Sequence, residues 1–303
     1  MAALPVTHTS KVTEEQIDHL GHMNVRYYAV NAAQGTRAVL GELGWNGRPF
    51  STYDVYTRHF HEQMLGTPLE VRSLVLEAGP DEVRLHHELR ASDSDALAAT
   101  FVHGIRALDA DGARVAFDDD VVDAATGRAG SLPDYAATRT ISLGADLLAS
   151  APTLEEALDG GMAMRKPRRI PAEECRADGS YDTTFAAVLT WGGEPSEGYT
   201  RGDVPYDTPD GKKMAWAAME NRCTINAWPR LGDRIQSFGA PVAIFDKVTH
   251  RVQWAYDLDS GDILNAFEVV SLAFDINQRR PMAIPEAFRA SETAQLQPQL
   301  LPR

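Results

Sequence analysis

Cysteine is scarce in this sequence of 303 residues, which contains only Cys175 and Cys223. The two lie far apart, without the C-x-x-C spacing of a zinc or redox site, so we expect reduced thiols rather than a disulfide. Basic residues are also few, since 29 Lys and Arg stand against 43 Asp and Glu and leave a formal net charge of −14. Nucleic-acid binding needs clustered Lys and Arg, so this balance argues against a general nucleic-acid-binding protein.

Long apolar segments are absent as well. No run in the sequence approaches the roughly 20 residues of a membrane-spanning helix. The first residues also lack the basic region and apolar core of a secretory signal. We therefore expect no membrane association and a cytoplasmic location. The 44% hydrophobic content of a chain of this length favours two ordinary domains over one large domain.

The segment from Asp18 to Tyr28 concentrates the residue types that carry chemistry: an acid, two imidazoles, a glycine and an amide. Apolar or small residues recur at helical spacing after it, and Gly44 follows where a helix end favours a left-handed residue. These residues are Tyr28, Ala32, Gly35, Val39 and Leu43. Asn24 is therefore expected to cap a helix. The unpaired N–H groups of that helix start would stabilise a carbonyl oxygen that develops negative charge beside Gly21, with Asp18 across from it.

The pattern Asp-x-x-Gly-His-x-Asn before a long helix resembles the signature of hotdog-fold thioesterases of the 4-hydroxybenzoyl-CoA thioesterase type. The resemblance implies that Asp18 is the catalytic carboxylate, as a general base for water or as a nucleophile. It also implies that the backbone at the helix start polarises the thioester carbonyl. The expected catalytic residues are Asp18, His22 and Asn24, and the expected substrate-binding residues are Gly21, Met23, Tyr27, Tyr28, His59 and Glu62.

Two of these residues keep alternative interpretations. His22 either orients the loop as a hydrogen-bond donor or positions the thioester or the water. Glu62 either faces the acyl group near the end of the second strand or is a solvated edge residue. His19 and His22 have the short spacing of many zinc ligands, but no third ligand stands at motif spacing, so we expect neither a metal nor a cofactor.

The rest of the first half predicts strands. Residues 5–12 form a short first strand, and residues 50–62, 69–77, 83–91 and 96–108 form four more, separated by turn-forming segments such as Gly79-Pro80-Asp81. We expect the last four to form an antiparallel meander. A long helix wrapped by such a sheet is what a hotdog domain requires, so the fold class is α+β.

The second half repeats the first. Aligning Gly179 with Gly21 places Arg176 at the position of Asp18, and the later segments correspond at an offset of roughly 166 positions. Ser180 then matches His22, and Asp182 matches Asn24. We therefore predict two tandem hotdog units, each an antiparallel sheet around a long helix, with a catalytically degenerate second unit.

The predicted boundaries are 1–117 for the first unit, 118–160 for a surface linker, 161–290 for the second unit and 291–303 for a C-terminal tail. Residues 192–213 are rich in Gly and Pro and are expected to form a mobile lid or an ordered plug. The predicted function is hydrolysis of an acyl-CoA thioester to a free acid and coenzyme A, at one site per chain built from the first motif and the face of the second unit. Further pairing of these pseudo-dimeric chains is compatible with the sequence.

Two alternatives to this function remain open at the level of sequence. One is a hotdog-type hydratase or dehydratase that acts on an acyl-CoA, although the differently built Asp and His loop of those enzymes is missing here. The other is a non-catalytic module that binds acyl-CoA and in which Asp18 is structural.

Overall fold

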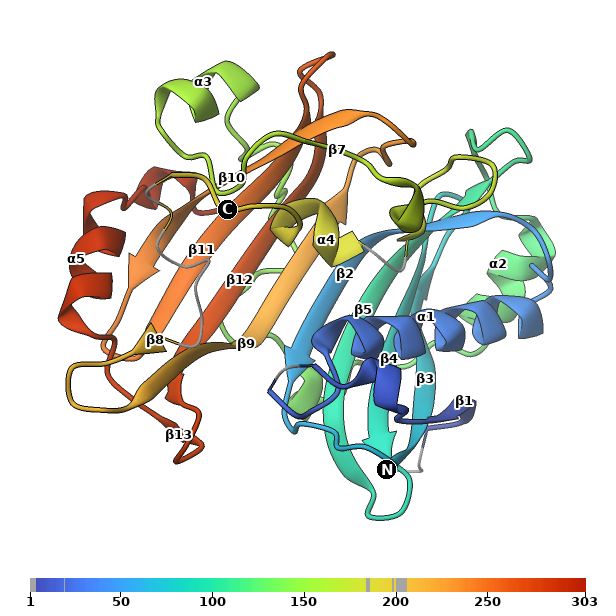
Figure 1. Cartoon of the computed structure of the whole chain (residues 1–303). Coiled ribbons are helices and arrows are strands. Elements are labelled where there is room, and N and C mark those ends of the chain that lie inside the picture. The colour runs from blue at the N-terminus through green and yellow to red at the C-terminus, as the bar shows by residue number, and fades with distance from the viewer. Residues whose placement is uncertain (1–3, 19, 184–185, 198, 200–205) are drawn as a thin grey trace. The chain divides into compact units, whose positions relative to one another are not determined.

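The computed structural model describes residues 4–18, 20–183, 186–197, 199 and 206–303. The chain forms two compact units, Met1–Thr138 and Arg139–Arg303, called unit 1 and unit 2 below. Each unit combines antiparallel strands with a few helices, which agrees with the predicted α+β class (Figure 1). Among the described residues, no helix combines the length and the apolar character that crossing a lipid bilayer requires.

The sheet of unit 1 has the strand order β1-β3-β4-β5-β2, and every neighbouring pair is antiparallel. Its strands are β1 (Val6–Lys11), β2 (Phe50–His59), β3 (Pro68–Ala78), β4 (Val83–Ala91) and β5 (Ala96–Leu108), with the short β6 (Arg114–Val115) beside β5. The predicted strands are present, but the predicted four-stranded meander is wrong in one respect. Strands β3, β4 and β5 follow one another as expected, whereas β2 pairs with β5 and not with β3.

The connection between β2 and β3 explains this order. A hairpin between β2 and β3 would need a short turn. Residues 60–67 instead form a longer connection that runs past the end of β5. The N–H groups of Phe60 and His61 donate to the carbonyl of Ala98, and the carbonyl of Gln63 accepts from the N–H of Met23. The chain after β2 therefore passes directly beside the loop that carries Asp18.

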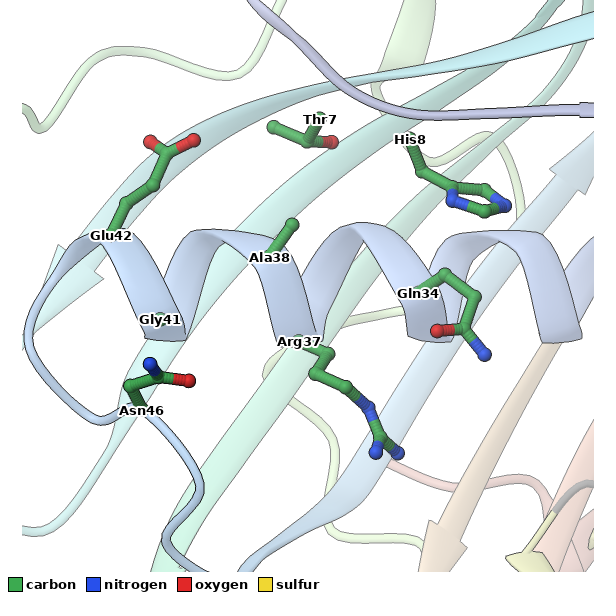
Figure 2. Close-up of a pocket in the computed structure, with 8 residues that line it drawn as sticks. All are labelled: Thr7, His8, Gln34, Arg37, Ala38, Gly41, Glu42 and Asn46. Atoms are coloured by element: carbon green, nitrogen blue, oxygen red, sulfur yellow. The ribbon is translucent and has the colours of Figure 1, made fainter.

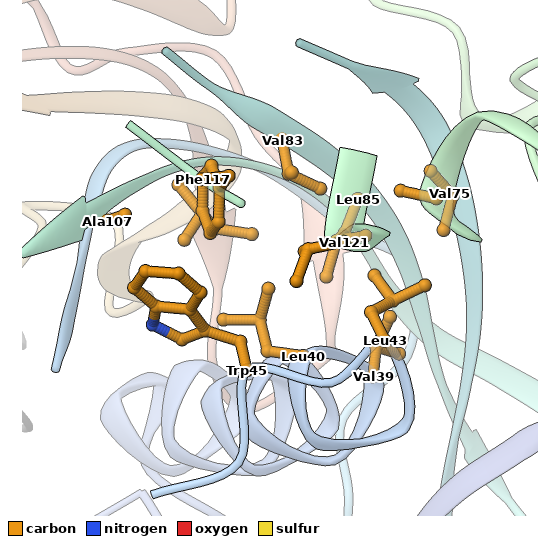
Figure 3. Close-up of a cluster of buried hydrophobic side chains, with 12 residues drawn as sticks. Val39, Leu40, Leu43, Trp45, Val75, Val83, Leu85, Ala107, Phe117 and Val121 are labelled. Atoms are coloured by element: carbon orange, nitrogen blue, oxygen red, sulfur yellow. The ribbon is translucent and has the colours of Figure 1, made fainter. Parts of the chain in front are cut away.

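Helix α1 (Val25–Glu42) lies against this sheet, as its apolar spacing predicts (Figure 1). At its C-terminal end Val39, Leu40 and Leu43 pack with Trp45 and with strand residues such as Leu85 (Figure 3). Gly44 adopts a φ of +101°, the left-handed conformation expected after a helix end. The helix also buries the polar residues Asn31 and Thr36, which the apolar pattern does not predict.

The segment expected to be a surface linker, 118–160, is mostly exposed but contains short helices that bury a few residues. It contains α2 (Asp119–Thr126), whose Val121 and Ala125 belong to the same core as Leu85, and the 3-10 helix η2 (Asp134–Ala136). Farther along, α3 (Leu154–Asp159) buries Ala157 in unit 2. The apolar residues among the acidic ones therefore form helices that cover the cores of their own units.

The sheet of unit 2 has the strand order β9-β12-β11-β10-β7, again antiparallel. Its strands are β7 (Arg168–Arg169), β9 (Lys213–Ile225), β10 (Arg234–Ile244), β11 (Val248–Asp257) and β12 (Ile263–Asp275), with β8 (Tyr206–Asp207) beside β9 and β13 (Arg280–Pro281) beside β12. Strands β10, β11 and β12 begin 166, 165 and 167 positions after β3, β4 and β5. The four long strands therefore have the same order in both units: β3-β4-β5-β2 in unit 1 corresponds to β10-β11-β12-β9 in unit 2.

In unit 2, the helix expected after the second loop is described from Ala186 to Trp191 (α4), and Gly193 follows it with a φ of +90°. Helix α5 (Glu286–Ala294) buries Phe288 and, within the predicted tail 291–303, Glu292, and Leu300 and Leu301 of that tail contact the core around Trp254. Residues 198 and 200–205 of the expected lid or plug lie outside the described residues.

Candidate active site

The Asp18 loop is held by its own backbone. The N–H of Asp18 donates to the carbonyl of His22, and the N–H of Gly21 donates back to the carbonyl of Asp18, at 3.0 Å each. Gly21 has a φ of +82°, a conformation that favours glycine over a residue with a side chain. One oxygen of the Asp18 carboxylate, Oδ1, accepts from the N–H of Leu20 at 2.8 Å. The loop therefore fixes the carboxylate and leaves its Oδ2 oxygen toward His22.

The start of α1 is capped as predicted, since the Asn24 side chain accepts from the N–H of Arg26 at 3.0 Å. The expectation that several N–H groups are unpaired there is wrong. The N–H groups of Met23, Asn24 and Tyr27 also have acceptors within the protein. Among the described residues, the N–H of Val25 has none, and Val25 is exposed. The Val25 amide, which the sequence did not single out, is thus available to polarise a carbonyl.

His22 lies between two carboxylates. Its Nδ1 is 3.7 Å from Oδ2 of Asp18, and its Nε2 is 3.5 Å from Oε1 of Glu62. The side chains of Asp18 and His22 are 14% and 13% exposed, whereas that of Glu62 is 40% exposed. The sequence allows Glu62 to face either the acyl group or the solvent. In the structure it lies beside His22, because residues 60–67 pass next to the Asp18 loop. Acid, imidazole and second acid therefore form one group that is accessible to solvent at one end.

The aromatic residues expected at the site lie around this group in different ways. Tyr28 is buried and its hydroxyl donates to the carbonyl of His61 at 3.1 Å. Its ring meets that of His59 edge to face at 5.5 Å between centroids. Burial raises the pKa of Tyr28 above its usual value and lowers the pKa of His59 to about 4. Tyr27 turns toward the carbonyl of Glu15, at 3.5 Å. Both hydroxyl groups thus face backbone carbonyls of the segments that flank the loop.

Met23, the remaining expected residue, is fully buried in the core beneath the loop. Its backbone N–H donates to the carbonyl of Gln63, which holds the loop, and its side chain packs in that core. His19 lies outside the described residues, and within the described part of the chain no group of three or more His, Cys, Asp or Glu side chains is arranged to hold a metal ion.

The matching loop in unit 2 has the same backbone. The N–H of Arg176 donates to the carbonyl of Ser180, and the N–H of Gly179 donates to the carbonyl of Arg176, with Gly179 at a φ of +76°. The N–H of Asp182 donates to the carbonyl of Glu174, as that of Asn24 does to Gln16. The acid of the first loop is therefore replaced by Arg176 within an equivalent backbone.

An open hollow of about 530 Å³ lies elsewhere on unit 1, between α1 and β1 (Figure 2). Its lining is formed by Thr7, His8, Gln34, Arg37, Ala38, Gly41, Glu42 and Asn46. None of the expected site residues lines it, and its mixed charges do not indicate a ligand. We assign it no part in catalysis.

Neither a protein-family model nor the sequence of a curated protein matches the chain. Solved structures of thioesterases do match its fold. A Lactobacillus plantarum protein assigned as an oleoyl thioesterase has a TM-score of 0.64 at 9% identity and covers 94% of this chain and 99% of its own. An acyl-ACP thioesterase from Bacteroides thetaiotaomicron has a TM-score of 0.60 at 8% identity, with 87% of this chain and 96% of its own covered.

The 12:0-ACP thioesterase from Umbellularia californica gives a TM-score of 0.60 at 7% identity and covers 88% of this chain and 93% of its own. At these identities the likeness concerns the fold alone. The chain has the fold of hotdog-type thioesterases over most of its length, and the 4-hydroxybenzoyl-CoA thioesterase subtype stays a prediction.

Proposed function

We propose that this protein hydrolyses acyl thioesters at the Asp18 loop of unit 1. The observation that carries the proposal is the group formed by Asp18, His22 and Glu62 at the start of α1, beside the unpaired N–H of Val25. Ester and thioester hydrolysis needs a base or nucleophile, a donor for the oxyanion and a proton for the leaving group. The loop offers a candidate for each role.

In the proposed reaction, Asp18 removes a proton from water as the water oxygen attacks the thioester carbon. The Val25 N–H donates to the carbonyl oxygen, which carries the negative charge of the tetrahedral intermediate. The carbon–sulfur bond then breaks, and the sulfur leaves with the bonding electron pair and takes a proton from His22. The proton held by Asp18 passes to His22, which restores both side chains. General base catalysis of this kind contributes about 10²- to 10⁴-fold.

Asp18 could instead attack the carbon directly and form a mixed anhydride that water then hydrolyses. Both routes need the ionised carboxylate in the same place, and both leave His22 as the proton donor. Glu62 would hold the imidazole through Nε2, so that Nδ1 faces Asp18. After a single turnover in ¹⁸O-labelled water, label in Asp18 identifies the anhydride route with attack of water at the Asp18 carbonyl, because the general-base route places solvent oxygen in the product acid only.

The identity of the thiol carrier is part of the proposal. The sequence favours coenzyme A, whereas two of the structurally similar proteins are named as thioesterases of acyl carrier protein.

We infer that unit 2 is a second hotdog unit in tandem with the first, because its long strands have the same order and its loop repeats the same hydrogen bonds. Since Arg176 replaces the acid there, unit 2 has no equivalent base.

The proposal is tested by thiol release from a panel of acyl thioesters, each offered on coenzyme A and on acyl carrier protein. We expect enzyme-dependent release from at least one acyl group and a preference for one carrier. A panel of short, long and aromatic acyl groups that yields no release on either carrier would overturn the proposal and favour a non-catalytic binding module.

A further inference from the structure

Unit 2 contains a buried arginine, two of whose three guanidinium nitrogens have no hydrogen-bond partner among the described residues. Arg251 on β11 is 1% exposed, and its Nη1 donates to Oε2 of Glu292 on α5 at 2.7 Å. Its Nε and Nη2 meet no acceptor in the part of the chain that the structure describes. These two nitrogens form one side of the guanidinium fork, the arrangement that binds a carboxylate through two parallel N–H bonds. Leaving such buried donors unmatched is costly.

A second unmatched group lies on the same face of the strand. Thr249 is fully buried, and its hydroxyl likewise has no partner among the described residues. Alternate residues of a strand point to the same side, so Thr249, Arg251 and Gln253 share one face of β11. Gln253 accepts from the indole N–H of Trp191 in α4 at 2.5 Å, which identifies this face as the one that α4 covers.

A second guanidinium adds positive charge. The guanidinium carbons of Arg165 and Arg251 lie 5.7 and 6.0 Å from the centroid of the Tyr199 ring. The Nε of Arg165 is also buried without an acceptor within the described residues. In that same part of the chain, Glu292 is the one carboxylate that pairs with either arginine. Two cations against one carboxylate favour the entry of a further anion.

The fold itself does not require an arginine at this position. Arg251 pairs with Pro241 on β10 and Val269 on β12, and 166 positions earlier Leu85 pairs with Val75 and His103. In unit 1 Leu85 packs beneath the C-terminal half of α1. In unit 2 α4 ends at Trp191, and the matching place holds a charged side chain instead. A leucine would fill this position in a purely structural unit.

We propose that unit 2 binds an organic carboxylate at Arg251. The carboxylate accepts from Nε and Nη2 of Arg251, the Thr249 hydroxyl donates to it, and Arg165 supplies additional positive charge. This site lies entirely within unit 2 and does not depend on the catalytic role of Asp18. It gives the unit that lacks the catalytic acid a ligand of its own.

The test measures ligand binding to the full-length protein by calorimetry and by the shift of its thermal unfolding. The probes are sodium acetate, butyrate and octanoate, with octanol as an uncharged control and inorganic phosphate as a tetrahedral anion. We expect saturable binding of at least one carboxylate, none of octanol and weaker binding of phosphate. The longest carboxylate that binds measures the room at the site.

Three variants locate the binding. Thr249→Val keeps the shape of the side chain and should weaken carboxylate affinity about five-fold, the effect of about one hydrogen bond. Arg251→Leu combined with Glu292→Gln restores the residue type of unit 1 without a lone buried charge and should abolish binding. Arg234→Ala, which removes an exposed ion pair with Asp259 in the same sheet, should change nothing.

Asp18→Asn separates this site from the catalytic one. Carboxylate affinity that is unchanged in Asp18→Asn but weakened in Thr249→Val supports the proposal, even if the protein hydrolyses no thioester. Affinity that is lost in Asp18→Asn, unaffected by Thr249→Val, greater for phosphate or equal for octanol would overturn it.

Discussion

At the scale of single residues, the site depends on one imidazole held between two acids. Asp18 and His22 belong to the motif that the sequence displays, and the spacing of four positions is enough to predict their proximity. Glu62 is different, because it reaches His22 only through the path of residues 60–67. A sequence shows such a residue as a polar side chain near a strand end and gives no sign of what it faces.

Replacement of Glu62 by Gln should lower kcat about ten-fold and leave KM nearly unchanged, because Glu62 acts through His22 and does not touch the acyl group in our proposal. Steady-state kinetics on the best thioester of the panel measures both constants. Glu42→Gln, on the far end of α1, is the matched control. A raised KM with normal kcat would instead assign Glu62 to substrate binding.

The buried histidines of unit 1 predict acid sensitivity. The Thr36 hydroxyl lies 2.9 Å from Nε2 of His87 and 2.8 Å from Nδ1 of His103. Burial, with a smaller contribution from His86, lowers the pKa of His103 to about 3, and burial lowers that of His87 well below its usual value. The unfolded chain therefore binds more protons than the folded chain below pH 6.5, the usual His value.

Stability should consequently fall as the pH drops from about 6.5 toward these lowered values, by about 1.4 kcal/mol per pH unit for each such histidine. Urea unfolding at several pH values measures this slope. In His103→Gln the slope between about pH 5.5 and 4.5 should be smaller by one proton, about 1.4 kcal/mol per pH unit. An unchanged slope in this variant would show that His103 does not remain neutral in the folded protein.

At the scale of the element, α1 was predictable because its signals are local. All of these signals lie within one segment, and the structure confirms them. They are the helical spacing of the apolar and small residues, the cap at Asn24 and the left-handed Gly44. The pairing of β2 with β5 was not predictable, since it joins segments far apart in sequence and no turn signal announces it. The end of α4 at Trp191 also has a local cause, since Gly192 and Gly193 follow it and Gly193 is left-handed.

The cap at Asn24 supports both the helix and the site. Its side chain accepts from Arg26, and its own N–H donates to the carbonyl of Gln16. Asn24→Ala should lower the free energy of unfolding by about 1 kcal/mol, the usual effect of removing an N-cap. Asn24→Asp, which can still cap, is the control, and chemical denaturation measures both. Equal losses in the two variants would show that the cap bond contributes little.

At the scale of the whole molecule, the chain carries two loops with equivalent backbones and different side chains, which the tandem repeat that we propose would explain. The two loops share their backbone hydrogen bonds and their left-handed glycine, at Gly21 and Gly179. Sequence alone predicted this alignment because glycine and cap positions are strongly constrained. It did not predict Arg251, because a charged residue in a strand gives no sign of being buried.

A tight, non-hydrolysable thioester analogue should therefore bind at one equivalent per chain, because only the first loop carries the acid. Arg176→Ala should leave this stoichiometry and kcat unchanged. Isothermal titration measures the number of sites. Two equivalents of equal affinity would contradict the proposal that unit 2 is degenerate.

The measurement that tests the proposed function most directly compares thiol release by the wild-type protein and by Asp18→Asn at saturating thioester. Asn resembles Asp in size and still suits the turn, so the fold should persist and can be checked by thermal unfolding. We expect kcat to fall by at least about 10²-fold, the lower end for removal of a general base. Equal turnover by the folded variant and the wild type would remove Asp18 from the mechanism and leave its loop a structural element.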